Sequence, residues 1–244
     1  MVVRSPGEFA AAVRAHAFGG QALDRGAVAR ARQSLAAAGL LVVGEPHGVR
    51  ETPGVLLSLA RALGTRAVAF EWSWEELNEP VQAFVAGGAF EFERIWSIPP
   101  SAEFFSGDGR VTAGHFALLE RLRTEGRLEQ AILIDRLDPV PPPEPRARER
   151  ALADRLLREW DGARPLLVLV GAGHALLDAG ETMASCLARR RPALEPVLLA
   201  YARGHGWFHG PYEVSPPPVS RATVLRLPLA TPAVVPVAGG RSDA

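Results

Sequence analysis

The stretch "LLVVGEPHGVRE", residues 40–51, brings an apolar segment of strand type to an end at Gly44. Within the next seven positions the chain places four ionisable residues, Glu45, His47, Arg50 and Glu51. One such residue after a strand is an ordinary surface feature, but four together indicate a site. The rest of the sequence decides between these interpretations.

Length and composition are those of an ordinary globular protein. The chain has 244 residues, a formal net charge of zero and a hydrophobic fraction of 48%, enough for one large domain with a substantial core. There is no basic stripe that would predict nucleic-acid binding. No apolar run reaches the roughly 18 residues of a membrane span, so no membrane partner is expected. The start of the chain lacks the pattern of a signal peptide, which favours a cytoplasmic protein.

Two features of the composition exclude particular chemistries. All 27 basic residues are arginines, so neither a Schiff-base lysine nor a P-loop lysine is available. Cys186 is the single cysteine, which excludes an internal disulfide and a cysteine-rich zinc site. The abundance of Arg and Ala is typical of high-GC bacterial genomes.

Apolar runs of strand length alternate with helical patterns along the chain. We expect strands at residues 40–44, 66–72, 130–135, 165–171 and 195–202, with an edge strand at 222–228. Helices are expected to begin at Ser5-Pro6 and at Thr52-Pro53, with further helices near 26–38, 74–86, 113–125, 145–160 and 178–190. Continuous rather than alternating hydrophobicity suits strands that are covered on both faces. The pattern predicts a three-layer α/β fold with a mainly parallel central sheet and helices on both faces.

The same pattern predicts how the chain is divided. Residues 1–230 form one α/β catalytic domain, because no convincing boundary interrupts the alternation of elements. Residues 87–112 are aromatic and glycine-rich without a clear period, and we expect them to form a lid or cover over the site. Residues 231–244 are expected to be a flexible tail.

The ends of the predicted strands share one chemical character. The first ends at Glu45 and His47, the second at Glu71, the third at Asp135 and the fourth shortly before His174. In an open α/β sheet, ligands collect beyond the carboxyl ends of the strands. An acid or a histidine at each of four neighbouring ends therefore predicts a functional site on that side of the sheet.

Glu45 and His47 are two residues apart, so in extended backbone their side chains point the same way. A carboxylate beside an imidazole can fix the ring tautomer and stabilise the imidazolium, which suits a general base. Glycines at 44 and 48 leave room for a substrate or water near His47, and those at 171 and 173 do the same near His174.

These residues resemble motifs of the erythromycin esterase-like and ChaN-like superfamily, whose remote relatives include the TIKI/TraB proteins. "GEPHGVRE" is similar to the first motif of the family, and Glu71 ends a strand as a family glutamate does. "RERALADRL", residues 148–156, resembles the start of a family helix and matches Arg148 to its arginine. "GAGHA", residues 171–175, resembles the histidine-bearing turn. The resemblance extends along most of residues 38–204.

The resemblance implies a hydrolase that acts on an ester, lactone or related acyl bond of a small-molecule substrate. His47 would be the base for water, with Glu45, Glu71 and Arg148 around it, and His174 would polarise the substrate carbonyl or stabilise the oxyanion. Residues expected near the substrate are Arg50, Glu51, Asp135, Trp72 and His115. The chain has Gly171 where the esterases have a second histidine, and its short first motif is closer to the ChaN-like and TIKI-like branches.

Three alternatives use the same residues. A divalent metal could be held by Glu45, His47 and His174 with Glu71 or Asp135, and the enzyme would then be a metal-dependent hydrolase. A haem or hydrophobic-cofactor binding protein is the weaker alternative, because no C-x-x-C-H motif is present. A biosynthetic cyclase or lyase could use the same His-Glu base. No cofactor is required by the principal hypothesis.

Overall fold

The structure, a computed structural model, describes residues 1–19, 22–136, 145–216 and 221–238. Its centre is a six-stranded sheet in which every neighbouring pair of strands is parallel. The strand order is β4-β3-β5-β2-β6-β9. In that order the strands span Gln130–Asp135, Ala67–Ser73, Leu166–Gly171, Leu40–Glu45, Val197–Tyr201 and Thr223–Leu227. The predicted edge strand is confirmed as β9.

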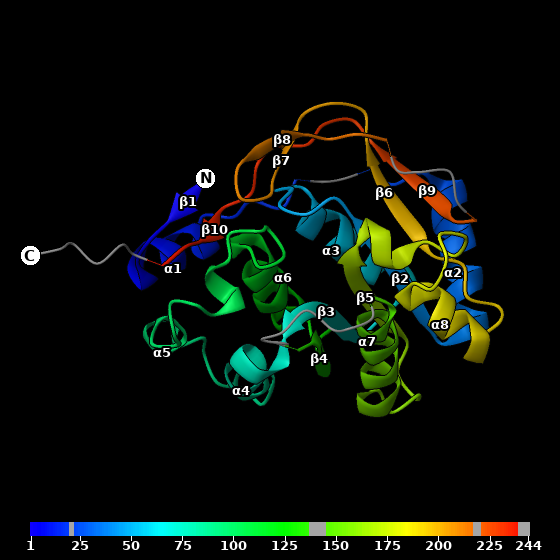
Figure 1. The fold of residues 1–244 in the computed structure, drawn as a ribbon, viewed down its shortest axis with the longest axis horizontal. Coiled ribbons are helices and arrows are strands. Elements are labelled where there is room, and N and C mark those ends of the chain that lie inside the picture. The colour runs from blue at the N-terminus through cyan, green and yellow to red at the C-terminus, as the bar shows by residue number, and fades with distance from the viewer. Residues whose placement is uncertain (20–21, 137–144, 217–220, 239–244) are drawn as a thin grey trace, which may run out of the picture.

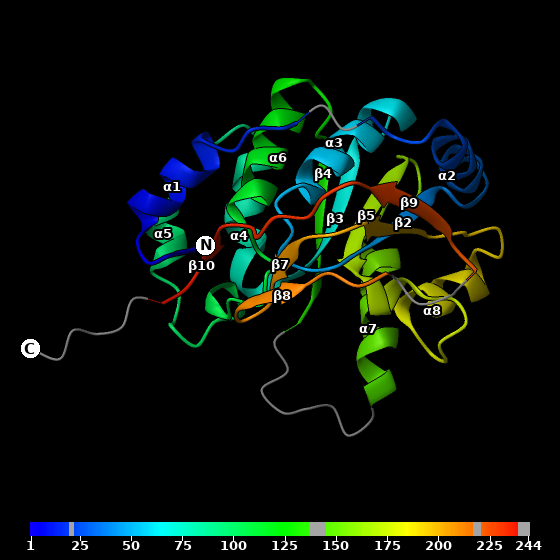
Figure 2. The same ribbon diagram turned by 90° about the horizontal axis from the view of Figure 1, so that it is seen from above.

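Helices cover both faces of this sheet, which confirms the predicted three-layer α/β class. Side chains from the first six helices pack in one apolar cluster: α1 (Pro6–Arg14), α2 (Arg25–Ala38), α3 (Thr52–Leu63), α4 (Trp74–Val85), α5 (Phe92–Trp96) and α6 (Ala113–Thr124). The last two helices, α7 (Pro145–Glu159) and α8 (Met183–Arg190), pack in a second cluster. Figures 1 and 2 show α7 and α8 on the opposite side of the sheet from α1, α3 and α6.

The division into two clusters follows from the alternation of side chains along each strand. In β2, Leu41 and Val43 belong to the first cluster, whereas Leu40 and Val42 belong to the second. Every residue of β2 is buried. Strands covered on both faces in this way have the continuous hydrophobicity that predicted them.

Shorter elements connect the sheet to its surroundings. Two 3-10 helices are η1 (Glu103–Phe105) and η2 (Ala172–Ala175). An antiparallel hairpin consists of β7 (His205–Trp207) and β8 (Pro211–Glu213). Strand β1 (Val2–Val3) pairs in parallel with β10 (Val235–Pro236).

The expectation of a flexible tail from residue 231 is wrong for its first part. Val235 is fully buried, and the amide of Ala233 donates to the carbonyl oxygen of Gly48 at 2.8 Å. The carboxylate of Glu51 accepts hydrogen bonds from the amide and the hydroxyl of Thr231, at 2.8 and 2.6 Å. The segment is ordered because it completes the backbone hydrogen bonding of the loop after β2. Residues 239–244 lie outside the described ranges.

The loop after β2 is held between three segments that are distant in sequence. Gly48 donates to the carbonyl oxygen of Gly109 at 3.1 Å, and its own carbonyl oxygen accepts from the amides of Trp207 and Ala233. Its φ angle is +67°, and a Cβ atom there would lie 2.0 Å from the Trp207 carbonyl oxygen. Only glycine fits this position. The clamp therefore fixes the backbone directly after His47.

We predict that Gly48→Ala destabilises the fold by several kcal/mol, because it adds a backbone collision to the cost of positive φ. Gly126→Ala is the matched control, since Gly126 has a φ of +65° and no atom near its added Cβ. That variant should cost only about 1 kcal/mol. Urea denaturation of the three proteins measures both effects. Equal loss of stability in the two variants would contradict the claim that the segments around Gly48 leave no room for a side chain there.

Candidate active site

The pair of Glu45 and His47 lies at the carboxyl end of β2, near the middle of the sheet. Glu45 is 2% exposed, and its Oε1 lies 3.3 Å from Nδ1 of His47. Its Oε2 has no hydrogen-bond partner among the described residues. Burial raises the pKa of Glu45 more than His47 lowers it. Burial alone would lower the pKa of His47, but the hydrogen bond to Glu45 and the charge of Glu71 outweigh it and raise that pKa.

The other ring nitrogen of His47 faces the end of β5. Glu45 is in register with Gly171, and a Cβ atom at Gly171 would lie 2.7 Å from Nε2 of His47. The absence of a side chain at 171 is therefore what makes room for the imidazole. Glu45, His47, Glu71, Trp72 and Arg110 are among the residues that line a small cavity here. Its volume of about 10 Å³ is enough for one water molecule.

Glu71, at the end of β3, is buried and fully engaged. Its Oε2 accepts from the backbone amide of Gly171 at 2.8 Å, and its Oε1 accepts from Nη2 of Arg148 at 2.7 Å. Oε1 also lies 3.2 Å from Nε2 of His174. Burial opposes ionisation of Glu71, but His174, His47 and Arg148 together hold its pKa well below the usual range. Glu71 is therefore a charged anchor and not a proton acceptor at neutral pH.

His174 is a second histidine beside Glu71. Its Nδ1 lies 2.8 Å from Oε1 of Glu149, and its Nε2 lies 3.2 Å from Oε1 of Glu71. Burial would lower the pKa of His174, but these two carboxylates raise it to about 9. At neutral pH His174 is thus an imidazolium that bridges two acids. The two histidines are connected through Glu71, which both of them approach.

A network of arginines and acids continues from Glu71 to β4. Arg110 contacts Asp108 at 2.6 Å and Asp135 at 2.8 Å, and it also pairs with Glu103. Arg148 donates to Asp135 at 2.5 Å. Asp135, at the end of β4, thus joins the two guanidinium groups, and the candidate site extends over the ends of four strands.

Sequence reasoning missed several members of this network: Glu103, Asp108, Arg110 and Glu149. Three of them lie within residues 87–112, the segment expected to cover the site. Its charged side chains Glu103, Asp108 and Arg110 take part in the network. The available signal was "SGDGR", residues 106–110, in which an acid lies between two turn-forming glycines and an arginine follows. Glu149 was detectable only as the neighbour of Arg148.

Two predicted substrate-binding residues are packed in the core. Trp72 is 1% exposed and stacks on Phe70 and Phe116, although one edge of it lines the small cavity. His115 is also 1% exposed, and burial lowers its pKa to about 3. Its Nδ1 contacts the hydroxyl of Thr112 at 3.1 Å. The neutral ring packs against Phe70 and Trp72 and is not open to a substrate in this structure.

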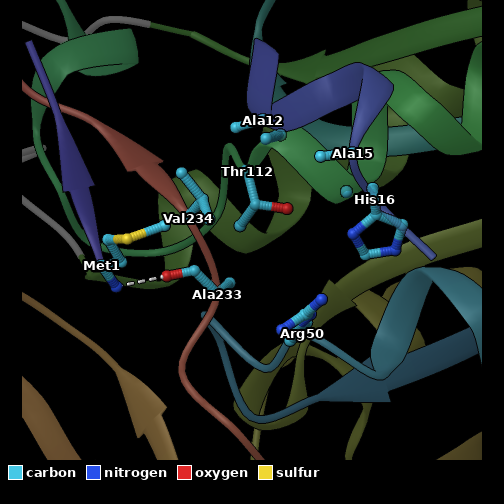
Figure 3. A pocket seen from close by; sticks show the side chains of 10 residues that line it. Met1, Ala12, Ala15, His16, Arg50, Thr112, Ala233 and Val234 are labelled. Carbon is cyan, nitrogen blue, oxygen red and sulfur yellow. Dashed lines mark hydrogen bonds between the residues drawn. The ribbon is translucent and has the colours of Figure 1, made fainter. Parts of the chain in front are cut away.

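Arg50 and Glu51, the remaining predicted substrate-binding residues, lie apart from the pair at 45 and 47. Glu51 is engaged with Thr231. Arg50 lines a different cavity, which Figure 3 shows. The four ionisable residues of the opening stretch therefore have separate roles. Asp135, in contrast, is part of the network around Glu71.

The proposed metal ligands do not converge in this arrangement. Both ring nitrogens of His174 face carboxylates of Glu149 and Glu71, and Arg148 lies 3.0 Å from its Nε2. A cation placed there would lie against a guanidinium group. Within the described ranges no group of three or more His, Cys, Asp or Glu side chains is arranged to hold a metal ion. Among the described helices, none is long and apolar enough to cross a membrane.

Comparisons with known proteins find similar folds at low sequence identity. No protein-family model and no curated protein matches the chain. A crystal structure of a Bacillus cereus protein is similar with a TM-score of 0.63 and 9% identity, covering 96% of this chain and 100% of that one. The C-terminal region of Pasteurella multocida toxin, described with a thiol-protease-like catalytic triad, is similar with a TM-score of 0.51 and 12% identity. That match covers 81% of this chain and 27% of the toxin chain.

These likenesses show a shared fold, and an enzyme is among the proteins that have it. The thiol chemistry of the toxin has no counterpart in the candidate site, because Cys186, the single cysteine, lies in α8 beside Arg189.

We predict that Glu149→Gln lowers the pKa of His174 from about 9 towards the ordinary value near 6.5, because the strongest hydrogen bond to its imidazolium loses its charge. Gln retains an acceptor for the amide of Met183, which Glu149 binds at 2.7 Å. NMR titration of the His174 ring measures the shift. Glu181→Gln, which neutralises a nearby acid that pairs with Arg150 and Arg189 and not with His174, is the control and should leave that pKa unaltered. An unchanged pKa in Glu149→Gln would refute the bridging role.

Proposed function

We propose that the protein is a hydrolase of esters, lactones or related acyl bonds. In this proposal His47 activates a water molecule, and Glu45 orients the His47 ring and stabilises its protonated form. The observation that carries this proposal is the contact of Glu45 with Nδ1 of His47, beside a cavity with room for about one water. His47 is 18% exposed on its side chain, so a substrate can approach it from outside. We further propose membership of the erythromycin esterase-like and ChaN-like superfamily, on the motifs quoted above.

In this proposal the reaction is a direct attack of water on an acyl carbon. Nε2 of His47 takes a proton from the water, and the resulting oxygen nucleophile adds to the carbonyl carbon. The imidazolium then returns the proton to the departing alkoxide, which leaves as an alcohol while the acyl group becomes a carboxylic acid. Glu45 stabilises the imidazolium between these two proton transfers.

Arg148 is the cation best placed to stabilise the oxyanion of the intermediate. Its side chain is 31% exposed, and Glu71 and Asp135 hold the guanidinium at the rim of the site. His174 contributes a positive charge beside it, because the two acids that its ring nitrogens face keep the imidazole protonated. Charge that is fixed in advance near a developing oxyanion lowers the barrier without reorganisation.

A one-water cavity favours hydrolysis over cyclisation or elimination at the same base. A cyclase or lyase has to exclude water from its base once the substrate is bound, whereas a hydrolase has to retain it. The small cavity that His47 lines has room for about one water, which supports the hydrolase. The two classes otherwise require the same pair of residues.

We expect His47→Ala to reduce turnover of aryl esters or lactones by about 10²- to 10⁴-fold, the usual contribution of a general base. A panel of aryl esters and lactones of increasing ring size, assayed with both proteins, measures this. His205→Ala, which removes an exposed histidine from β7, is the control and should retain full activity. Equal turnover by His47→Ala and wild type, or no turnover of any substrate by wild type, would refute the proposal.

The pH dependence of turnover should report the pKa of His47. The base acts in its neutral form, so the rate should rise with pH through a pKa above the ordinary 6.5. In Glu45→Gln the hydrogen bond loses its charge, so this pKa should fall and the rising limb should move to lower pH, with a lower plateau. A rising limb at the same pH in both proteins would contradict the role of Glu45.

A further inference from the structure

A second cavity lies apart from the candidate active site, between the end of α1, the start of α6 and the segment before β10. Its volume is about 120 Å³. A cavity of roughly that size can hold a benzene-sized molecule. Polar groups along its walls come from His16, Arg50 and Thr112, and apolar groups from Ala12, Ala15 and Val234 (Figure 3).

The charge of this cavity is not compensated. None of the described residues that line it is acidic. In the described parts of the chain the Arg50 guanidinium has no carboxylate partner, whereas Arg110 and Arg148 each have several. Burial and the positive charge of Arg50 lower the pKa of His16 to about 4, so the ring is neutral at pH 7. The Met1 ammonium, which donates to the carbonyl oxygen of Ala233 at 2.7 Å, is a second cation at this cavity. The two positive groups, without a lining acid, make the potential inside the cavity positive.

The polar groups around the Arg50 guanidinium are held in place. The amide of Arg50 donates to the carbonyl oxygen of Thr231 at 2.8 Å, which fixes its backbone. The His16 ring packs edge-on against Phe18. A Cβ atom at Gly114 would lie 2.7 Å from Cε1 of His16, so glycine at that position lets the ring lie against α6. The packing of the His16 imidazole against Phe18 and Gly114 thus holds the ring in position beside the Arg50 guanidinium.

We propose that this cavity binds a small organic carboxylate whose body is apolar. The carboxylate pairs with the Arg50 guanidinium, with the His16 ring and the Thr112 hydroxyl beside it. The apolar body lies against Ala12, Ala15 and Val234. Each polar wall then meets a polar part of the ligand, and each apolar wall meets an apolar part. This site is independent of the hydrolase proposal, since none of its residues belongs to the His47 site.

Benzoate is a suitable probe, and benzamide is its uncharged counterpart of the same shape. The His16 ring resonances of the full chain, followed by NMR at pH 7, should shift saturably with benzoate. Benzamide should bind at least tenfold more weakly, because it cannot form the charge-assisted pair with Arg50. Equal affinity for the two compounds, or no saturable shift with benzoate, would overturn the proposal.

Two variants locate the binding. Arg50→Gln should weaken benzoate binding at least tenfold, and it should fold normally because no hydrogen bond of the guanidinium to a described residue is lost. Arg226→Gln, which removes an exposed arginine from β9, should bind benzoate as wild type does. Thermal unfolding of both variants checks that they are folded. Unchanged benzoate binding in Arg50→Gln would show that the cavity is not the site.

Discussion

The structure around the candidate site depends on two carboxylates, Glu45 and Glu71, buried at the ends of strands near the centre of the sheet. A buried charge is costly unless it is paired and hydrogen-bonded. Glu71 meets this demand with the Gly171 amide and with the cations of Arg148 and His174. Glu45 lies beside His47 but has no arginine partner among the described residues, and its Oε2 has no hydrogen-bond partner there. The two acids therefore have opposite properties, one a fixed anion and one with a raised pKa.

Because of this difference, Glu71 has a structural role in the site and the pair of Glu45 and His47 has a catalytic role in the proposal. The charges around Glu71 hold β3, β5 and α7 together and keep the Arg148 guanidinium at the rim of the site. The pair at the end of β2 keeps a titratable imidazole, whose backbone is clamped at Gly48 by the segment around Gly109, the β7–β8 hairpin and the C-terminal segment. Tyr212 of that hairpin also donates to the carbonyl oxygen of His47 at 2.8 Å. Late parts of the chain thus position a residue near its beginning.

The sequence predicted the fold well because its signal is local. Runs such as residues 40–44 and 165–171 need burial on both faces, and only a covered parallel sheet provides it. The strand-end rule also located Glu71, Asp135 and His174 in one network. Arg50, Glu51 and His115, also expected near the substrate, lie outside this network, because proximity in sequence does not determine which cavity a side chain enters. The strand-end rule could not find Arg110 or Glu149, whose roles arise from long-range charge pairing without any local pattern. The tail after residue 231 was misjudged for a similar reason, since its backbone partners lie in the loop after β2.

The central claim is that Glu45 fixes the tautomer of His47 and leaves Nε2 free to accept a proton from water. Multiple-bond ¹H–¹⁵N NMR of the neutral His47 ring, recorded above its pKa, tests this claim most directly because it identifies which nitrogen carries the hydrogen. The account predicts hydrogen on Nδ1, donated to Glu45, with an unprotonated Nε2. Hydrogen on Nε2 would contradict it, since that nitrogen could not then act as the base.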